Sequence, residues 1–160
     1  MLYHEWLKER NACAEAVAWV GDQSLQHAWT MTGHGDWMLW LLQRLGYDDE
    51  RVLRLHACWC VRQVWHLLTD ERSRNVVEVA ERFAVGEATR EELAAAGAAA
   101  GAAAETAWAA RDAARAAEVA ARVAGVAAGA ARAAQADHLR ETIPWEIVSA
   151  LATKAGITEE

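Results

Sequence analysis

The sequence predicts an all-α protein: a compact multi-helix bundle with a long Ala-rich helical segment. Apolar residues recur at three- and four-residue spacing through the first 86 residues, which is the period of an amphipathic helix. Residues 91–136 are more than half alanine, the residue with the highest helix propensity. A chain of 160 residues is long enough for one domain with its own core. We therefore expect a single helical domain over residues 1–160, with Trp-rich helices in 1–86, the Ala-rich segment in 89–141 and a C-terminal helix in 143–156.

The first helices end at turn residues. The apolar positions between Leu2 and Val20 follow a helical period, so we expect one amphipathic helix that ends at Gly21. Asp22 or Ser24 can then cap a second, short helix.

The helix predicted over residues 36–45 is the element around which the bundle is organised. Asp36 is suited to its N-cap and Gly46 to its end. Between them the sequence is apolar on every side and includes Trp37 and Trp40. Because a helix that is apolar all round requires burial all round, we expect this helix to be the central structural strut of the fold.

The next helix should run from the acidic residues at 47–50 to about Thr69, since acidic side chains favour a helix N-terminus. Its apolar face, the predicted packing face, carries Leu53, Ala57, Cys60, Val61, Val64 and Leu68. A second face forms a basic stripe of Arg51, Arg54, Cys58, Arg62 and His66.

Cap signals mark the remaining helices. Asp70 can cap the helix that follows. Thr89 and Glu92 form a Ser/Thr-x-x-Glu capping box, a specific start signal for the Ala-rich segment. Near the end of the sequence, Pro144 lies in the first turn of a last helix that stops at Gly156.

The Ala-rich segment is too long to be one straight helix in a compact domain. A helix over residues 91–136 would measure ~70 Å, whereas a domain of this size has a radius of gyration of ~15 Å. We expect the segment to bend or break near a glycine pair. The pairs Gly97/Gly101 and Gly125/Gly129 have the small-x-x-x-small spacing that lets a neighbouring helix approach closely. Indole rings of the Trp-rich half can fill the volume that alanine leaves open.

The charge of the chain limits the classes of partner. The formal net charge is −7, from 23 acidic and 16 basic residues. This balance argues against a nucleic-acid backbone or an anionic membrane as the main partner, since both attract basic surfaces. The sequence also lacks an apolar run of membrane-spanning length and the features of a signal peptide. We expect a cytoplasmic protein that binds neither membrane nor DNA directly and whose acidic surface suits a basic protein.

The nearest approach to a metal cluster is the set His56, Cys58, Cys60 and His66. His56 and Cys60 share a helix face at i, i+4, as helical ligands do. No second pair with ligand spacing occurs, so we expect these residues to be structural, without a metal, and all three cysteines, Cys13 included, to be free. The chain has no Gly-rich phosphate loop, no G-x-S-x-G and no paired-carboxylate motif. We therefore expect neither enzymatic activity nor a cofactor.

The tryptophans divide into core and candidate binding residues. Those on apolar faces, expected in the core, are Trp6, Trp19, Trp29, Trp37, Trp40 and Trp59. Trp65, Trp108 and Trp145 are less firmly placed. Trp108 lies beside Arg111 and Arg115, which predicts a cation–π surface pair or an interaction hot spot. The candidate binding residues are Trp65, Trp108, Arg62, Arg111, Arg115 and His66.

Motifs spread over nearly the whole chain carry a family resemblance. They are Gly35-Asp36-Trp37-x-Leu39-Trp40-Leu41, Ala57-Cys58-x-Cys60, the Ala-Arg-Asp-Ala-Ala-Arg-Ala-Ala run at 110–117, and Gln135-Ala136-Asp137-His138-Leu139-Arg140 through Ile143-Pro144-Trp145. In this order they resemble a family of Ala-rich helical immunity proteins, which are linked to polymorphic toxin systems and also found in phage genomes. The resemblance implies a cytoplasmic protein that neutralises a toxin or effector by binding it. It carries over no catalytic residues.

We therefore expect a non-enzymatic binding protein, of immunity type or phage anti-defence type, whose partner is a basic toxin or defence effector such as a nuclease. Two alternatives stay open. One is a small-ligand binder that sequesters a nucleotide signal through Trp and Arg side chains. The other is a structural homo-oligomer held by the Ala-rich helices. An exposed Trp and acidic patch would favour the protein binder, and arginines converging on an accessible indole would favour the nucleotide binder.

Overall fold

The computed structural model describes the backbone of residues 1–63, 65–107 and 125–158, and the side chains of 1–63, 65–99 and 129–158. The described elements are α-helices and one short 3-10 helix, which confirms the predicted all-α class. By internal packing the chain forms two compact units: unit 1 is Met1–Asp48 with Ala127–Glu160, and unit 2 is Asp49–Val126. Compact units can belong to one domain, so the single-domain expectation stays a prediction.

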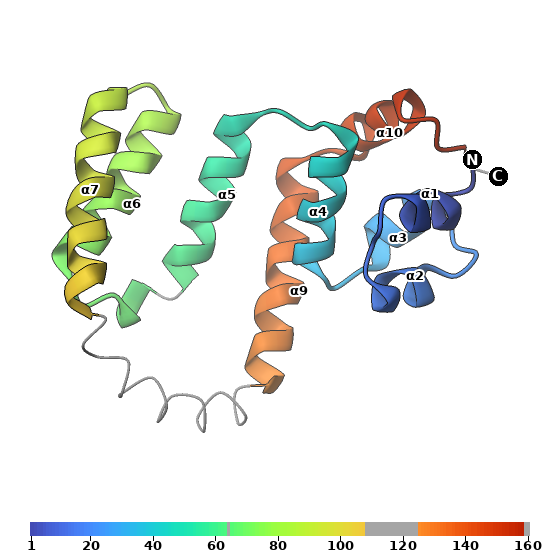
Figure 1. Cartoon of the computed structure of the whole chain (residues 1–160), viewed down its shortest axis with the longest axis horizontal. Coiled ribbons are helices and arrows are strands. Elements are labelled where there is room, and N and C mark those ends of the chain that lie inside the picture. The colour runs from blue at the N-terminus through green and yellow to red at the C-terminus, as the bar shows by residue number, and fades with distance from the viewer. Residues whose placement is uncertain (64, 108–124, 159–160) are drawn as a thin grey trace. The chain divides into compact units, whose positions relative to one another are not determined.

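Unit 1 is built from α1 (Tyr3–Glu9), α2 (Ala14–Val20), α3 (Leu25–Met31), α4 (Gly35–Leu45), most of α9 (Gly125–Thr142) and α10 (Trp145–Lys154) (Figure 1). Its largest fully buried side chains are Trp6, Leu25, Met38, Leu42, Leu139, Ile143 and Val148. These residues come from both ends of the chain. The core of unit 1 therefore forms only when the C-terminal helices pack against the N-terminal ones.

The N-terminal helix is interrupted, and the prediction of one helix from residue 2 to 20 is wrong. Asn11 adopts a left-handed conformation with φ 57°, which asparagine tolerates better than most residues. The N–H of Ala12 donates to the carbonyl of Leu7 at 3.0 Å and closes the end of α1. Cys13 then caps α2, where its Sγ accepts from the N–H of Ala16 at 3.4 Å. Both halves keep the same apolar spacing, so periodicity alone did not reveal the break.

Helix α4 begins one residue earlier than predicted. His34 is its N-cap residue, without a capping hydrogen bond from its side chain, and Gly35 is its first residue. Asp36 lies in the first turn, where its carboxylate still suits the positive end of the helix dipole. The prediction that Asp36 caps this helix is therefore wrong. Gly46 ends the helix in the left-handed conformation, as predicted, with φ 78°.

Helix α4 is also less buried than its composition suggested. The buried face consists of Gly35, Met38, Leu41, Leu42 and Leu45. Trp37 and Trp40 are only half-buried, and Gln43 and Arg44 are exposed. The helix therefore has one packed face and one face available to solvent or to a partner.

Two contacts join α9 to the N-terminal helices, and Figure 1 shows α9 alongside α4. A Cβ on Gly35 would lie 2.7 Å from the Cβ of Gln135 and 3.1 Å from the backbone nitrogen of Ala136. One turn further along α9, the Nη1 of Arg140 donates to the carbonyls of Trp29 and Thr32 at 2.9 and 3.0 Å. Arg140 thus satisfies carbonyl groups at the C-terminal end of α3.

The predicted close approach of a helix at the glycine pairs stays a prediction, because one glycine of each pair lies outside the described side chains. A Cβ on Gly97 or Gly129 would meet no described atom within 4 Å. Gly101 and Gly125 are helical, but what surrounds them lies outside the described residues. Among the described glycines, Gly35 instead provides the tight helix contact.

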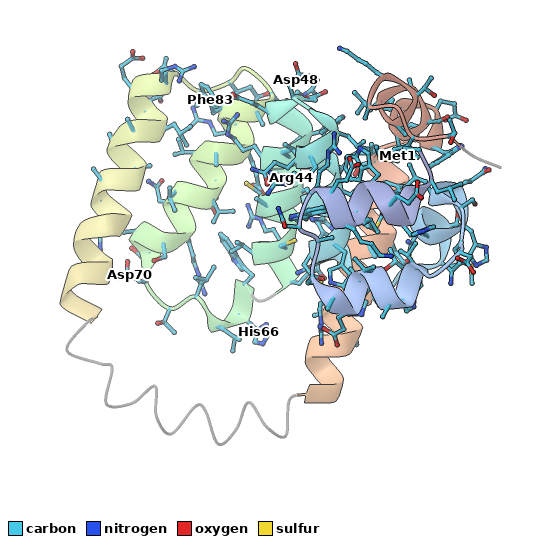
Figure 2. All side chains as sticks on the ribbon, turned by 45° about the vertical axis from the view of Figure 1, so that its right-hand side comes forward. Met1, Arg44, Asp48, His66, Asp70 and Phe83 are labelled. Carbon is cyan, nitrogen blue, oxygen red and sulfur yellow. The ribbon has the colours of Figure 1, made fainter. Side chains whose placement is uncertain are left out.

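Unit 2 contains α5 (Glu50–Gln63), the 3-10 helix η1 (Trp65–Leu67), α6 (Glu71–Ala84) and α7 (Arg90–Ala107). Helix α6 packs against both α5 and α7 (Figure 1). The three helices meet at Phe83, whose ring centroid lies 4.9 Å from the guanidinium carbon of Arg54 and 5.9 Å from that of Arg90. Figure 2 shows Phe83 at one end of α6 and Asp70 at the other.

The cap predictions for unit 2 are confirmed. The carboxylate of Asp70 accepts from the backbone N–H of Arg72 at 2.8 Å at the start of α6. The capping box before α7 has both of its bonds: Thr89 Oγ1 accepts from the N–H of Glu92 at 3.1 Å, and the Glu92 carboxylate accepts from the N–H of Thr89 at 2.7 Å. Each signal acts within a few residues, so the sequence is sufficient to identify it.

Helix α5 buries a different face from the predicted one. His56 and Cys58 are buried, whereas Ala57 is exposed. The Sγ of Cys58 lies 3.9 Å from the carbonyl oxygen of Val77 on α6. Burial, with a smaller contribution from the charge of Glu81, raises the pKa of Cys58 and keeps it a neutral thiol.

Candidate functional site

A pocket of ≈ 400 Å³ lies among α1, α2, α3 and α4 of unit 1. Its aromatic lining consists of Tyr3, Trp19, Trp29, Trp37 and Trp40, and we call it the aromatic pocket. Most of the remaining lining is aliphatic: Leu7, Ala12, Ala16, Val20, Ala28, Met38 and Leu41. Small-molecule sites and side-chain anchors typically occupy concave, mostly apolar pockets of about 300–1,000 Å³. The aromatic pocket is therefore the strongest candidate binding site in the part of the chain that the structure describes.

The break between α1 and α2 contributes to the aromatic pocket. The break lets α2 turn back so that it packs against α1. It also places Asn11 and Cys13 in the lining of the aromatic pocket. Trp19 on α2 then approaches Trp37 on α4, with ring centroids 6.0 Å apart and planes inclined by 59°. His34 stacks on Trp37 at 3.8 Å with an angle of 9° between the rings. Trp37 is thus held by two aromatic neighbours.

Few polar groups reach the aromatic pocket. Asp36 is the one charged residue among its described lining residues, and its side chain is 57% exposed. Its Oδ1 lies 3.7 Å from the Nδ1 of His34. Thr32 is buried, and its Oγ1 accepts from the N–H of His34 at 3.2 Å. Burial raises the pKa of Tyr3 well above its usual range, so that side chain is a neutral phenol.

The expected placement of the tryptophans is confirmed in part. Trp6 and Trp29 are buried in the core. Trp19 is 36% exposed, so its prediction as a core residue is wrong. Trp37 and Trp40, together with Trp59, are half-buried. A signal that could have revealed the aromatic pocket was the pair Asn11 and Cys13, which are turn and cap residues between two short apolar stretches.

A second aromatic cluster lies in unit 2, around Trp65. The guanidinium carbon of Arg62 lies 3.9 Å from the centroid of the Trp65 ring, and that of Arg74 lies 5.6 Å from it. Both ends of the Arg62 guanidinium donate to the Glu81 carboxylate, with 2.9 Å between Arg62 Nε and Glu81 Oε1. This hydrogen bonding raises the pKa of Arg62 and lowers that of Glu81, so both groups stay charged.

Two of the predicted binding residues, Trp65 and Arg62, are therefore in contact. Arg74 and Glu81, which α6 supplies, were not among the predicted binding residues. Because Glu81 compensates the charge of Arg62, this cluster has the character of a structural link between α5 and α6. His66 is exposed, and Figure 2 shows it at the same end of unit 2 as Asp70. The other predicted residues, Trp108, Arg111 and Arg115, lie outside the described residues.

The His and Cys residues of α5 form one close pair. The Sγ of Cys60 lies 3.6 Å from the Nε2 of His56. Among the described side chains, those of residues 1–63, 65–99 and 129–158, no three from His, Cys, Asp or Glu are close enough together to hold a metal ion. Cys13, Cys58 and Cys60 are free thiols, and of these only Cys13 is exposed.

Comparisons with protein-family models, with curated proteins and with solved structures found no match. Among the described helices, none combines the length and the apolar character needed to cross a membrane.

Proposed function

We propose that this chain is a non-enzymatic binding protein of immunity or anti-defence type, and that its aromatic pocket receives a side chain of the protein that it neutralises. The observation that carries the proposal is the aromatic pocket itself, with Trp19 exposed at 36%. Tryptophan dominates protein–protein hot spots because it buries a large area at a low entropy cost. The resemblance to immunity proteins, which extends over nearly the whole chain and is most specific in the motif around Trp37 and in the Ala-Arg-Asp run at 110–117, supports the same class.

The charge of unit 1 supports a basic partner. Residues 1–48 and 127–160 carry eleven acidic and six basic residues. A partner with a basic face would associate faster with this unit and would be favoured over acidic competitors. Since surface charges are screened over about 8 Å at physiological ionic strength, its association rate should fall as salt is added.

Capture of the partner from the cells that carry the gene tests this proposal. We expect native mass spectrometry of the purified protein to show a stoichiometric protein companion. Trp19→Ala should abolish that complex, because it removes the exposed wall of the aromatic pocket. Met31→Ala is the matched control: Met31 is 61% exposed on α3 and lies outside the pocket lining. A companion that both variants retain would contradict the assignment of the aromatic pocket.

A small ligand in the aromatic pocket is the second candidate, because ≈ 400 Å³ also accommodates a small organic molecule. A small mass released on denaturation, in place of a protein, would favour it. A nucleotide is less suited to this pocket, since its described lining includes no Lys, Arg or His to pair with phosphate. The homo-oligomer alternative predicts that Gly129→Leu lowers the native mass, because an added side chain would obstruct a close helix contact there.

A further inference from the structure

We infer that the aromatic pocket of unit 1 is a cage for a cationic side chain, arginine or lysine, that a basic partner inserts. This inference rests on the proposed function, because it names the chemical group that the partner presents. Indole rings attract cations through the negative potential over their faces, and aromatic cages recognise cationic groups in this way. The cage is formed by Trp19 and Trp37, with Asp36 as its acidic group.

Asp36 gives the aromatic pocket a negative charge. No other charged residue contributes to the described lining. The carboxylate lies in the first turn of α4, next to Trp37 in the chain, and its exposed position leaves it accessible to an incoming group. A cation between an indole face and a carboxylate gains from both attractions, whereas an anion would be repelled by Asp36.

Other tryptophans of unit 1 already show the same chemistry within the chain. The guanidinium carbon of Arg10 lies 4.4 Å from the centroid of the Trp6 ring, and that of Arg44 lies 5.5 Å from the Trp40 centroid. In the described part of the chain, no arginine lies over Trp19 or Trp37 in this way. Of the pocket's indole rings without an arginine, Trp29 is buried, whereas Trp19 is exposed and Trp37 is half-buried, so Trp19 and Trp37 are the ones accessible to a cation from outside.

The shape of the aromatic pocket suits a long amphipathic side chain. Beyond Trp19 and Trp37 the lining is aliphatic, and the phenol of Tyr3 is neutral. The methylene groups of arginine or lysine bury well against such walls while the charged end stays near a polar group.

A titration with two probes of the same shape tests the inference. N-acetylarginine methylamide carries the charge, and N-acetylcitrulline methylamide is its neutral counterpart. The readout is the indole N–H signal of Trp19 and of Trp37 in two-dimensional NMR spectra, each assigned with its Trp→Phe variant. We expect both signals to shift with the arginine probe, and the citrulline probe to bind at least about threefold more weakly.

The role of Asp36 is tested with Asp36→Asn. This variant should weaken binding of the arginine probe by about threefold or more and leave the citrulline probe unchanged. Glu15→Gln is the matched control: Glu15 is an exposed acid on α2 that does not line the aromatic pocket, so its removal should change neither titration. Both substitutions are at exposed positions and preserve side-chain size, so folding should be retained.

The outcomes separate this inference from the proposed function. Equal binding of the two probes would overturn the cation cage while leaving a side-chain pocket in place. Titrations that leave the Trp19 and Trp37 signals unmoved would also overturn it. If the arginine probe binds as expected but Trp19→Ala still retains the protein companion, the cage is upheld and the proposed use of the aromatic pocket fails.

Discussion

Gly35 on α4 and Gln135 on α9 lie in direct contact, so close that a Cβ on Gly35 would be 2.7 Å from the Cβ of Gln135. No pair of side-chain-bearing residues can adopt this spacing without a shift of the backbone. The contact sets the position of α4, which carries Trp37 and Asp36 into the aromatic pocket. Gly35 and Gln135 therefore both have a packing role.

Gly35→Ala should therefore destabilise the protein. The added methyl group forces α4 and α9 apart, and overpacking of this kind costs about 1–3 kcal/mol. Gly97→Ala is the matched control, because a Cβ there meets no described atom within 4 Å and Ala has the higher helix propensity. That variant should be more stable by up to about 1 kcal/mol. Urea denaturation measures both, and equal midpoints for the two variants would contradict the contact.

Arg140 should contribute to stability through hydrogen bonds to backbone carbonyls. Arg140→Met keeps most of the side-chain volume but leaves the carbonyls of Trp29 and Thr32 without their donor. An unsatisfied buried group costs about 1–3 kcal/mol of stability. Since these carbonyls are part-buried, we expect the free energy of unfolding to fall by about 2 kcal/mol. Arg132→Met, at an exposed position on the same helix, should change the free energy of unfolding by less than about 0.5 kcal/mol. Chemical denaturation of the two variants tests the difference.

Acid should weaken the cap of α6. The side-chain hydrogen bond from Arg72, with its backbone N–H, lowers the pKa of Asp70 from 3.8 to about 2. Because the folded-state pKa is depressed, the stabilising contribution is fully present above the unfolded-state pKa and is lost as the pH falls from 3.8 through about 2.

The measurement is urea denaturation of wild type and Asp70→Asn across this pH range. The difference in their free energies of unfolding should be constant near neutral pH and should shrink towards pH 2. Arg72→Gln should move the midpoint of that change to higher pH. A difference that is independent of pH throughout would show that the carboxylate gains nothing from its partners.

Cys13 should report occupancy of the aromatic pocket. It is exposed and lines the pocket, whereas Cys58 is buried and Cys60 is half-buried, so a maleimide should label Cys13 first. Saturating amounts of the arginine probe should slow that labelling, as followed by mass spectrometry. Labelling of the Cys13→Ser variant gives the background from the other two thiols. An unchanged rate in the presence of a bound probe would place the probe outside the aromatic pocket.

Helix ends could be predicted from the sequence where the capping interaction joins residues that are close together in the chain. Ser24 caps α3, Asp70 caps α6, and Thr89 with Glu92 caps α7, each through bonds that span two or three residues. Gly46 likewise ends α4 through its own backbone conformation. Such interactions depend on neighbours in the chain, so residue type and spacing are enough to identify them.

The same local reasoning failed where two signals competed. Asn11 and Cys13 split a stretch whose apolar period continues on both sides, and the period alone favoured one helix. At α4, the cap signal of Asp36 favoured a later start, but the helix begins at Gly35, which packs against Gln135. The break between α1 and α2 is made by local hydrogen bonds that the apolar period obscured, whereas the contact of Gly35 joins residues 100 positions apart in the sequence.

Composition and local spacing thus settled the helical class, the caps of α6 and α7, and the acidic character of the chain. The tertiary structure alone decided the aromatic pocket, the Gly35–Gln135 contact and the link from Arg140 to the end of α3. These features join residues from the two ends of the chain or from helices that diverge at a turn. Helix period and propensity do not tell which helix packs against which other helix. That pairing depends on how the whole unit packs its apolar surface away from water.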